Sequence, residues 1–413
     1  MKNIFLAITV VLLTMTGCCC DDAQSVPQTF NYTPDFKALK VDESRLARID
    51  ALLQDYVEKG IIPHALTFVA KDGQVIHHKA FGWRDVEKQI PLANDDIFRM
   101  YSQTKAVTTV ALMTLFEEGK FQLDDPVSKY IPEMTDRVLV NPYDRNDTTT
   151  RKALTPVKIR HVLSHTAGIQ GPRGRTEPAA TLAEYVKTLV AAPLIYDPGT
   201  QWNYHPSSDV WARLVEVISG QDLQVYVKEH VLDPLGITDM AYYYPESYKD
   251  RFVTMYRAEG DKIVPVEMWS GRYPFGEDTL FANGGTGLNG TIEGYARFCQ
   301  MILNNGIFNG NRVLGRRTIE IMSKDQVAHP SRQDDDFHFG IGWQIYPTDK
   351  LQWNTLDTFS PMVSGNALSW GGMANTDYII DPKENMIILL YTNRIPDTLV
   401  WEKFLNTVYQ ALE

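Results

Sequence analysis

The alternation of apolar and polar residues predicts strands near both ends of the chain. Near the amino end, apolar runs at residues 66–70 and 75–81 flank Asp72 and Gly73, a pair typical of a two-residue β-hairpin turn. Three further strands near the carboxyl end are predicted at residues 367–371, 377–380 and 386–393. The two chain ends therefore both supply strands to one antiparallel sheet.

Between and around these strands, apolar residues recur with the spacing of helices. The first predicted helix covers residues 44–58 and the last covers residues 396–412. Further helices are predicted at residues 181–190, 208–219, 221–231, 291–304 and 317–323. This order favours an α+β fold, with a sheet from both chain ends, flanking helices and a mainly helical insertion.

The beginning of the sequence predicts export. Lys2 precedes an apolar run at residues 4–13, which is shorter than the roughly 20 residues that span a bilayer. Met15-Thr-Gly-Cys18 follows and resembles a bacterial lipobox, in which the cysteine is lipidated. A secretory signal followed by a chance cysteine is the alternative.

We therefore expect residues 1–17 to be a lipoprotein signal peptide, Cys18 to carry the lipid and residues 18–40 to be a tether. The expected location is that of an exported bacterial lipoprotein, periplasmic or at the cell surface and anchored to a membrane.

Charge and cysteine content narrow the function. A net charge of −11 argues against a nucleic-acid partner, because binding to phosphates requires a basic surface. Outside the segment around Cys18, Cys299 is the one cysteine in the sequence, so we expect no internal disulfide. It lies in an apolar helical stretch and is interpreted as a buried small hydrophobe rather than a nucleophile.

Ser102-Gln-Thr-Lys105 is the candidate catalytic motif, and a predicted helix begins at Ser102. Residues three apart on a helix share a face, so Lys105 reaches the Ser102 hydroxyl. The free N–H groups of a helix N-terminus also favour negative charge on a reacting oxygen. A surface lysine on a solvated helix is the plain alternative.

The surrounding sequence resembles the class C β-lactamase superfamily, which includes D-alanyl peptidases and carboxylesterases. In order along the chain, the matching segments are Phe98-Arg-Met-Tyr-Ser102-Gln-Thr-Lys105, Leu163-Ser-His-Thr-Ala-Gly168, Pro198-Gly-Thr-Gln-Trp-Asn-Tyr204, Asp233-Pro-Leu-Gly236, Gly284-Gly-Thr-Gly-Leu288 and Ser369-Trp-Gly-Gly372. The resemblance implies one domain at residues 41–413, with a sheet part near residues 41–118 and 280–413 and a helical part near residues 119–279.

The resemblance also implies roles for individual residues. Ser102 is the nucleophile, Lys105 is its base, and Tyr204 hydrogen-bonds the Ser102 hydroxyl and protonates the leaving group. The N–H groups of Ser102 and Met373 form the oxyanion hole. The substrate-binding segment of the third motif is Trp370, Gly371 and Gly372.

Two departures from the family pattern bear on the substrate. Pro206 replaces the asparagine of the Tyr-x-Asn motif, and Ser207 or Ser208 is a candidate substitute. Trp370 replaces the lysine that offers β-lactamases and peptidases a cation for the substrate carboxylate. Trp370-Gly371-Gly372 also looks like the variant of the esterase branch.

We therefore predict a serine hydrolase that cleaves a small-molecule carboxylic ester, or a related acyl bond, through an acyl-enzyme on Ser102. The alternatives are a β-lactamase or D-alanyl carboxypeptidase with the same machinery, and a non-catalytic penicillin-binding-like module. No metal or organic cofactor is expected, and the sequence leaves the oligomeric state open.

Two other motifs are interpreted as structural. Residues 285–290 match G-x-G-x-x-G but follow no predicted strand, so we expect a glycine-rich loop near the floor of the active site. His161 and His165 have the spacing of a metal-binding pair but lack the accompanying glutamate. We expect His165 to order a buried loop through hydrogen bonds.

Overall fold

The computed structural model describes residues 26–135, 137–140, 149–171, 179–204, 206–260, 262–266, 275, 281–327, 337–348, 360–396 and 398–413. The predicted signal peptide and residues 18–25 of the predicted tether, Cys18 among them, lie outside these residues. The rest of the predicted tether, residues 26–40, is part of the fold rather than a spacer, since Asn31 pairs with Gln74 and Phe36–Leu39 form a helix. Among the described residues, no helix combines the length and the hydropathy needed to cross a membrane.

In the described part of the chain, nine strands form the main sheet, as predicted from the two chain ends. Eight follow the order β14-β15-β16-β17-β18-β1-β3-β4, and β2 pairs with β1. The carboxyl-terminal β18 lies antiparallel to the amino-terminal β1 at the centre, with Leu66 opposite Tyr391. The bounds are β1 His64–Lys71, β2 Gln74–His77, β3 Ala80–Asp85, β4 Ile90–Pro91, β14 His338–Phe339, β15 Gln344–Ile345, β16 Leu368–Gly372, β17 Thr376–Asp381 and β18 Met386–Tyr391.

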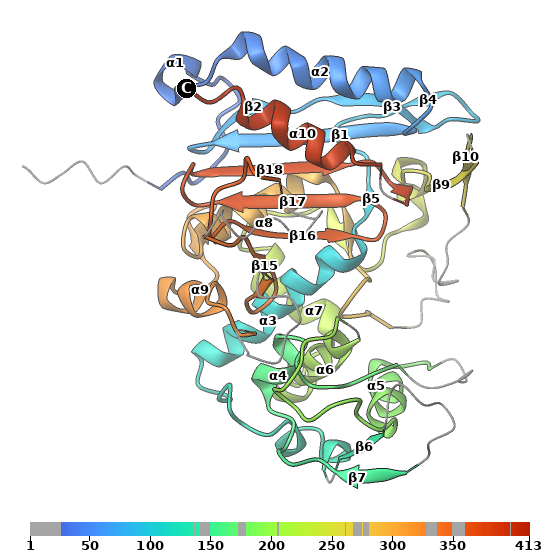
Figure 1. The fold of residues 1–413 in the computed structure, drawn as a ribbon, viewed down its shortest axis with the longest axis vertical. Helices are drawn as coiled ribbons and strands as arrows, with labels where there is room; N and C mark the ends of the chain where they lie inside the picture. Colours follow the sequence, from blue (N-terminus) through green and yellow to red (C-terminus); the bar gives the residue numbers. More distant parts are fainter. Residues whose placement is uncertain are drawn as a thin grey trace, which may run out of the picture.

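The central strands are largely buried because both faces of the sheet are covered. α2 (Glu43–Glu58) and α10 (Val400–Tyr409) pack on one face, whereas α8 (Ile292–Leu303) packs on the other (Figure 1). Along β1, Phe68 belongs to the core on the α8 side and Val69 to the core under α2 and α10. This alternation fixes the register of the sheet.

Several local predictions are confirmed and others need correction. Asp72 and Gly73 have φ values of 50° and 72°, as the predicted tight turn requires. The strand expected at residues 75–81 is interrupted, because the backbone at Lys79 pairs with the backbone N–H and side chain of Thr67. The helix predicted at residues 221–231 is α-helical only over Leu223–Val227, and the last helix is shorter than residues 396–412.

A mainly helical region lies below the sheet in Figure 1. It contains α4 (Ile159–Leu163), α5 (Leu182–Ala191), α6 (Ser207–Ser219), α7 (Leu223–Val227) and a π-helical turn at Lys228–Leu232. Between this region and the sheet lies α3 (Thr104–Glu117), which contacts α6. Because α3 is buried on nearly all sides, it is rigidly held where the two parts meet.

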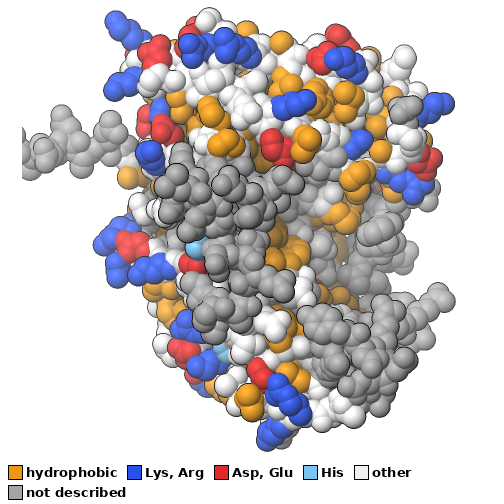
Figure 2. Space-filling model, in the orientation of Figure 1, with side chains coloured by type: hydrophobic (Ala, Val, Ile, Leu, Met, Phe, Trp, Pro, Cys, Tyr) orange, Lys and Arg blue, Asp and Glu red, His pale blue; other side chains and the backbone are white. Residues whose placement is uncertain are grey.

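Short elements complete the described chain. The minor strands are β5 Phe98–Arg99, β6 Val138–Val140, β7 Thr150–Lys152, β8 Met240–Ala241, β9 Tyr256–Glu259, β10 Lys262–Pro265, β11 Asn289–Gly290, β12 Ile307–Phe308, β13 Asn311–Arg312 and β19 Arg394–Ile395. The short helices are α1 Phe36–Leu39, α9 Arg316–Met322, and 3₁₀ turns at Tyr101–Gln103, Val127–Lys129, Pro132–Met134 and Glu246–Arg251. On the face shown in Figure 2, acidic and basic side chains are interspersed, so no large area of one sign forms there.

Candidate active site

Ser102 lies in a tight turn at the beginning of α3. Tyr101–Gln103 form a 3₁₀ turn and the α-helix begins at Thr104, so the helix predicted to open at Ser102 starts with a tighter turn. Tyr101 has a φ of 46°, a left-handed conformation that is unfavourable for a bulky residue. Strained backbone of this kind is held in place by its surroundings, and it re-aims the chain immediately before the candidate nucleophile.

Lys105 reaches Ser102 from the first turn of α3. Its Nζ lies 3.1 Å from Ser102 Oγ, the contact expected for residues three apart. The side chain is buried, and only 6% of the residue is exposed. A buried amine beside a hydroxyl is placed to exchange a proton with it.

A carbonyl far away in the sequence holds the other side of Lys105. Nζ donates a buried hydrogen bond of 2.9 Å to the carbonyl oxygen of Gly285. The glycine-rich loop predicted near the active site is thus next to the base, but its direct bond to Lys105 was not predicted. A Cβ at Gly285 would lie 2.4 Å from Ser208 Oγ and 3.2 Å from Lys105 Nζ, which explains the glycine at this point.

Tyr204 joins the site from the segment before α6. Lys105 Nζ lies 4.8 Å from the centre of its ring. Its hydroxyl accepts a hydrogen bond of 3.3 Å from Trp370 Nε1. The expected hydrogen bond between the Tyr204 and Ser102 hydroxyls is absent among the described contacts. The structure therefore brings Tyr204 to Lys105 and Trp370 and leaves its bond to Ser102 a prediction.

The third motif lies at the end of β16, against the turn that carries Ser102. A Cβ at Gly372 would lie 2.4 Å from the Met100 carbonyl, and one at Gly371 would lie 1.9 Å from Asp377 Oδ1. Only glycine allows the strand to approach the backbone this closely. Met373 follows directly, and its N–H as an oxyanion-hole donor stays a prediction.

Comparison with known proteins agrees with this architecture. The sequence model of the family described as Beta-lactamase matches residues 49–400. The chain belongs to the beta-lactamase family.

Similar proteins, found by sequence and by structure, match this chain over most of its length. Esterase EstB of Burkholderia gladioli is 26% identical over 391 residues, which cover 87% of this chain and 93% of EstB. A putative D-alanyl-D-alanine carboxypeptidase of Escherichia coli is 24% identical, covering 94% of this chain and 90% of its own. The solved structure of EstCE1, a hydrolase with promiscuous acyltransferase activity, superposes with a TM-score of 0.75 at 23% identity, over 89% of this chain and 99% of EstCE1. The predicted β-lactamase-like fold is thereby confirmed.

In this member of the beta-lactamase family, Pro206 is the N-cap residue of α6. Of the two candidate substitutes for the family's asparagine, Ser208 is the one whose hydroxyl comes close to Gly285, beside Lys105. Ser207 and Ser208 are both buried. Helix α6 therefore places a small hydroxyl beside Gly285, whose carbonyl holds Lys105, and its replacement of the family's asparagine stays a prediction.

Aromatic rings form one wall of the site. The ring of Trp370 lies 5.0 Å from that of Tyr204 and 5.3 Å from that of Phe339. Trp202 continues the wall, with its ring centre 5.7 Å from that of Phe339. Such a wall offers an apolar surface where the lysine of the β-lactamases would offer a charge.

His161 and His165 have separate surroundings and do not act as a pair. His161 Nδ1 accepts the Lys158 N–H, and burial lowers the pKa of His161 to about 4. The ring of His165 lies 4.8 Å from that of Tyr204, within the aromatic wall. Its loop is ordered through the backbone, since the His165 carbonyl accepts the Tyr196 hydroxyl at 3.2 Å.

The interpretation of Cys299 as a buried small hydrophobe agrees with the structure. Cys299 is fully buried in α8, and burial raises the pKa of its thiol. Within the described residues, no group of three or more histidine, cysteine, aspartate or glutamate side chains is placed to hold a metal ion.

Proposed function

We propose that this protein hydrolyses a small-molecule carboxylic ester through an acyl-enzyme on Ser102. The observation that carries the proposal is the direct contact of 3.1 Å between the buried Lys105 Nζ and Ser102 Oγ. A non-catalytic module has no need for this contact. The name of esterase EstB, a relative over most of the chain, supports the ester as the substrate class.

The chemistry follows from these groups. Ser102 Oγ attacks the ester carbonyl while Lys105 takes its proton, and the N–H groups of Ser102 and Met373 stabilise the oxyanion. As the C–O bond to the alcohol breaks, Tyr204 supplies the proton that the leaving alcohol needs. Water then attacks the acyl group by the same route in reverse, releasing the acid and restoring Ser102.

A D-alanyl carboxypeptidase or β-lactamase is the second candidate, favoured by the Escherichia coli relative. Both substrate types carry a carboxylate, which a cation in the site would bind. The described cation that contacts Ser102 is Lys105, which is also engaged with the Gly285 carbonyl. Trp370 stands where the family's lysine would offer a second cation. Ester cleavage is therefore the better-supported reaction.

The test uses residues 21–413 with p-nitrophenyl esters of increasing chain length, nitrocefin and D-alanyl-D-alanine peptides. A fluorophosphonate should label Ser102, and Ser102→Ala should lose labelling and ester turnover together. Ser219→Ala, at the far end of α6, is the matched control and should behave like the wild type. Labelling that persists in Ser102→Ala would overturn the assignment of the nucleophile.

We further propose that the protein is an exported lipoprotein anchored through Cys18. The apolar run at residues 4–13 and the lipobox-like Met15-Thr-Gly-Cys18 support this proposal. The first described residue, Val26, is eight residues from Cys18, so the folded domain would sit close to the membrane surface.

A further inference from the structure

The loop whose carbonyl holds Lys105 is itself held by buried side chains, through the residue before Gly285. Asp209, in the first turn of α6, accepts the Gly284 N–H through Oδ1 at 3.0 Å. Asp209 is 3% exposed, so this bond is shielded from water. A carboxylate is also favoured here by the N-terminus of α6.

A second contact fixes the same glycine from α3. Thr108 Oγ1 donates to the Gly284 carbonyl at 2.9 Å, and Trp211 Nε1 donates to Thr108 Oγ1 at 2.9 Å. All of these atoms are buried. Gly284 therefore has its N–H tied to α6 and its carbonyl tied to α3, and Gly285 follows it in the chain.

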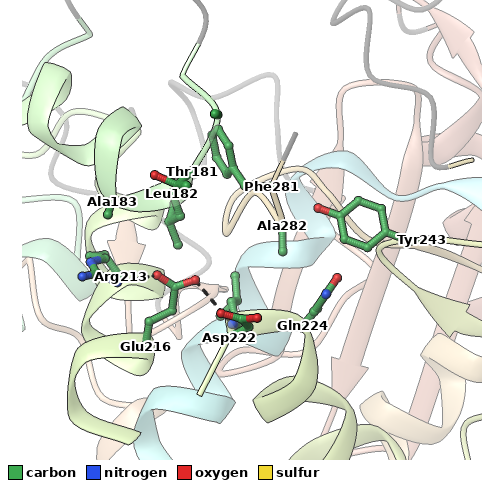
Figure 3. A pocket seen from close by; sticks show the side chains of 12 residues that line it. Thr181, Leu182, Ala183, Arg213, Glu216, Asp222, Gln224, Tyr243, Phe281 and Ala282 are labelled. Atoms are coloured by element: carbon green, nitrogen blue, oxygen red, sulfur yellow. Dashed lines mark hydrogen bonds and ion pairs between the residues drawn. The ribbon is translucent and has the colours of Figure 1, made fainter. Parts of the chain in front are cut away.

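A cavity lies beside the segment that leads into this loop. Phe281 and Ala282, directly before the loop, line a cavity of about 480 Å³. Glu216 and Arg213 of α6 and Tyr243 lie around its other sides (Figure 3). Gly284 itself packs directly on α6, since a Cβ there would lie 2.2 Å from the Ala212 Cβ, so the bond from Asp209 holds the loop at its close approach to this helix.

We propose that Asp209 is a positioning residue that acts through the Gly284–Gly285 peptide on Lys105. By fixing the Gly284 N–H, it anchors the segment from which the Gly285 carbonyl reaches Lys105 and holds Nζ against Ser102. A lysine has a long, flexible side chain, so loss of this carbonyl frees the amine to leave the hydroxyl. The inference rests on the proposed role of Lys105 as the base.

Asp209→Ala and Asp209→Asn test the proposal on the full chain with p-nitrophenyl acetate. The alanine variant should lower kcat by about 100-fold, the loss typical of a reacting group misplaced by 1 Å, with KM within about threefold. The asparagine variant keeps an oxygen that accepts the Gly284 N–H and should stay within about fivefold of the wild type. Glu216→Ala removes a carboxylate from the cavity side of the same helix and is the matched control, expected to be near wild type.

Two further measurements separate positioning from general structure. In a Lys105→Ala background, Asp209→Ala should cause no further loss, because its effect passes through Lys105. Amide hydrogen exchange of a peptide covering residues 283–288 should be faster in Asp209→Ala than in the wild type. If Asp209→Ala does not fold, Thr108→Val removes the other bond to Gly284 and should lower kcat in the same direction.

Unchanged kcat in folded Asp209→Ala, or equal losses in the alanine and asparagine variants, overturns the positioning role. Additive losses with Lys105→Ala overturn it as well. A failure of the proposed function looks different. In that case Lys105→Ala itself retains wild-type ester turnover, or the wild type turns over no ester.

Discussion

Adding one methyl group at Gly285 should disable the enzyme. The Cβ of Gly285→Ala would lie 2.4 Å from Ser208 Oγ, about 1 Å closer than a carbon and an oxygen tolerate. Both residues are enclosed between α3, α6 and the loop, so relief requires the loop to move away from α6. That movement stretches the 2.9 Å bond from Lys105 to the Gly285 carbonyl.

The size of the effect follows from this displacement. A shift of about 1 Å in the carbonyl would lengthen the bond to about 3.9 Å, beyond hydrogen-bonding distance. Misplacing a catalytic group by that amount costs about 100-fold in rate, equivalent to about 2.7 kcal/mol. Overpacking of a buried site also lowers stability by about 1–3 kcal/mol.

Steady-state kinetics on p-nitrophenyl acetate and a thermal unfolding curve measure the two effects separately. Gly171→Ala is the matched control, because among the described atoms none lies within 4 Å of its added Cβ. Ser208→Ala should rescue Gly285→Ala, because the nearest contacts then become Lys105 Nζ at 3.2 Å and the Cβ of residue 208 at 3.3 Å. Wild-type kcat in Gly285→Ala, or no recovery in the double variant, would refute the steric reasoning.

Three further predictions test the substrate, the anchor and the pH response. The kcat/KM for short neutral esters should exceed that for nitrocefin by at least ~100-fold. Trp370→Lys should narrow this gap, since a charge-assisted hydrogen bond from lysine to the substrate carboxylate is worth about 1.5–3 kcal/mol. Equal kcat/KM values in the wild type would contradict the assignment of an ester substrate. Cys18→Ala should release the protein from membranes or leave an uncleaved precursor, and unchanged fractionation with normal processing would rule out this anchor. Burial lowers the pKa of His64 and of His161 to about 4 from an ordinary 6.5. The unfolding temperature should therefore fall as the pH drops from 6.5 to 4, and an unfolding temperature that does not change over this range would contradict the prediction.

The sign of the pH prediction follows from proton binding. Between pH 6.5 and pH 4 the unfolded chain binds protons on these histidines more strongly than the folded chain does, so acidification favours unfolding. At His161 burial is the main cause of the lowered pKa, and the positive charges of Lys158 and Arg160 add to it. Its Nδ1 also accepts the Lys158 N–H, a bond that is lost once this nitrogen is protonated.

Local signals made the fold and the Ser102–Lys105 pair predictable. The apolar runs that become β1 and β18 predicted that both chain ends contribute to one sheet. That these two strands pair directly, with more than 300 residues between them, is seen only in the structure. The Ser102–Lys105 contact depends only on helical spacing. The interruption at Lys79 was not predictable, because it arises from a bond to Thr67 on the neighbouring strand.

The support of Lys105 lay beyond sequence reasoning for a physical reason. Its second partner is a backbone carbonyl 180 residues away, and a carbonyl carries no side-chain signature. In the sequence, Asp209 is an acidic residue in the first turn of a predicted helix, a position where the helix dipole alone is enough to explain an acidic side chain. Only the folded chain shows that its carboxylate meets Gly284.

Trp370 links the choice of substrate to proton transfer. Its ring forms part of the apolar wall, and its Nε1 donates to the Tyr204 hydroxyl at 3.3 Å. Because that hydroxyl oxygen already accepts a hydrogen bond from the wall, its own proton is free to point toward the reacting oxygen. A lysine at residue 370 would keep a donor near Tyr204 but remove the apolar surface, whereas phenylalanine would keep the surface and remove the donor. The loss of ester turnover in Trp370→Lys and in Trp370→Phe therefore apportions the role of this residue between binding the acyl group and orienting the tyrosine.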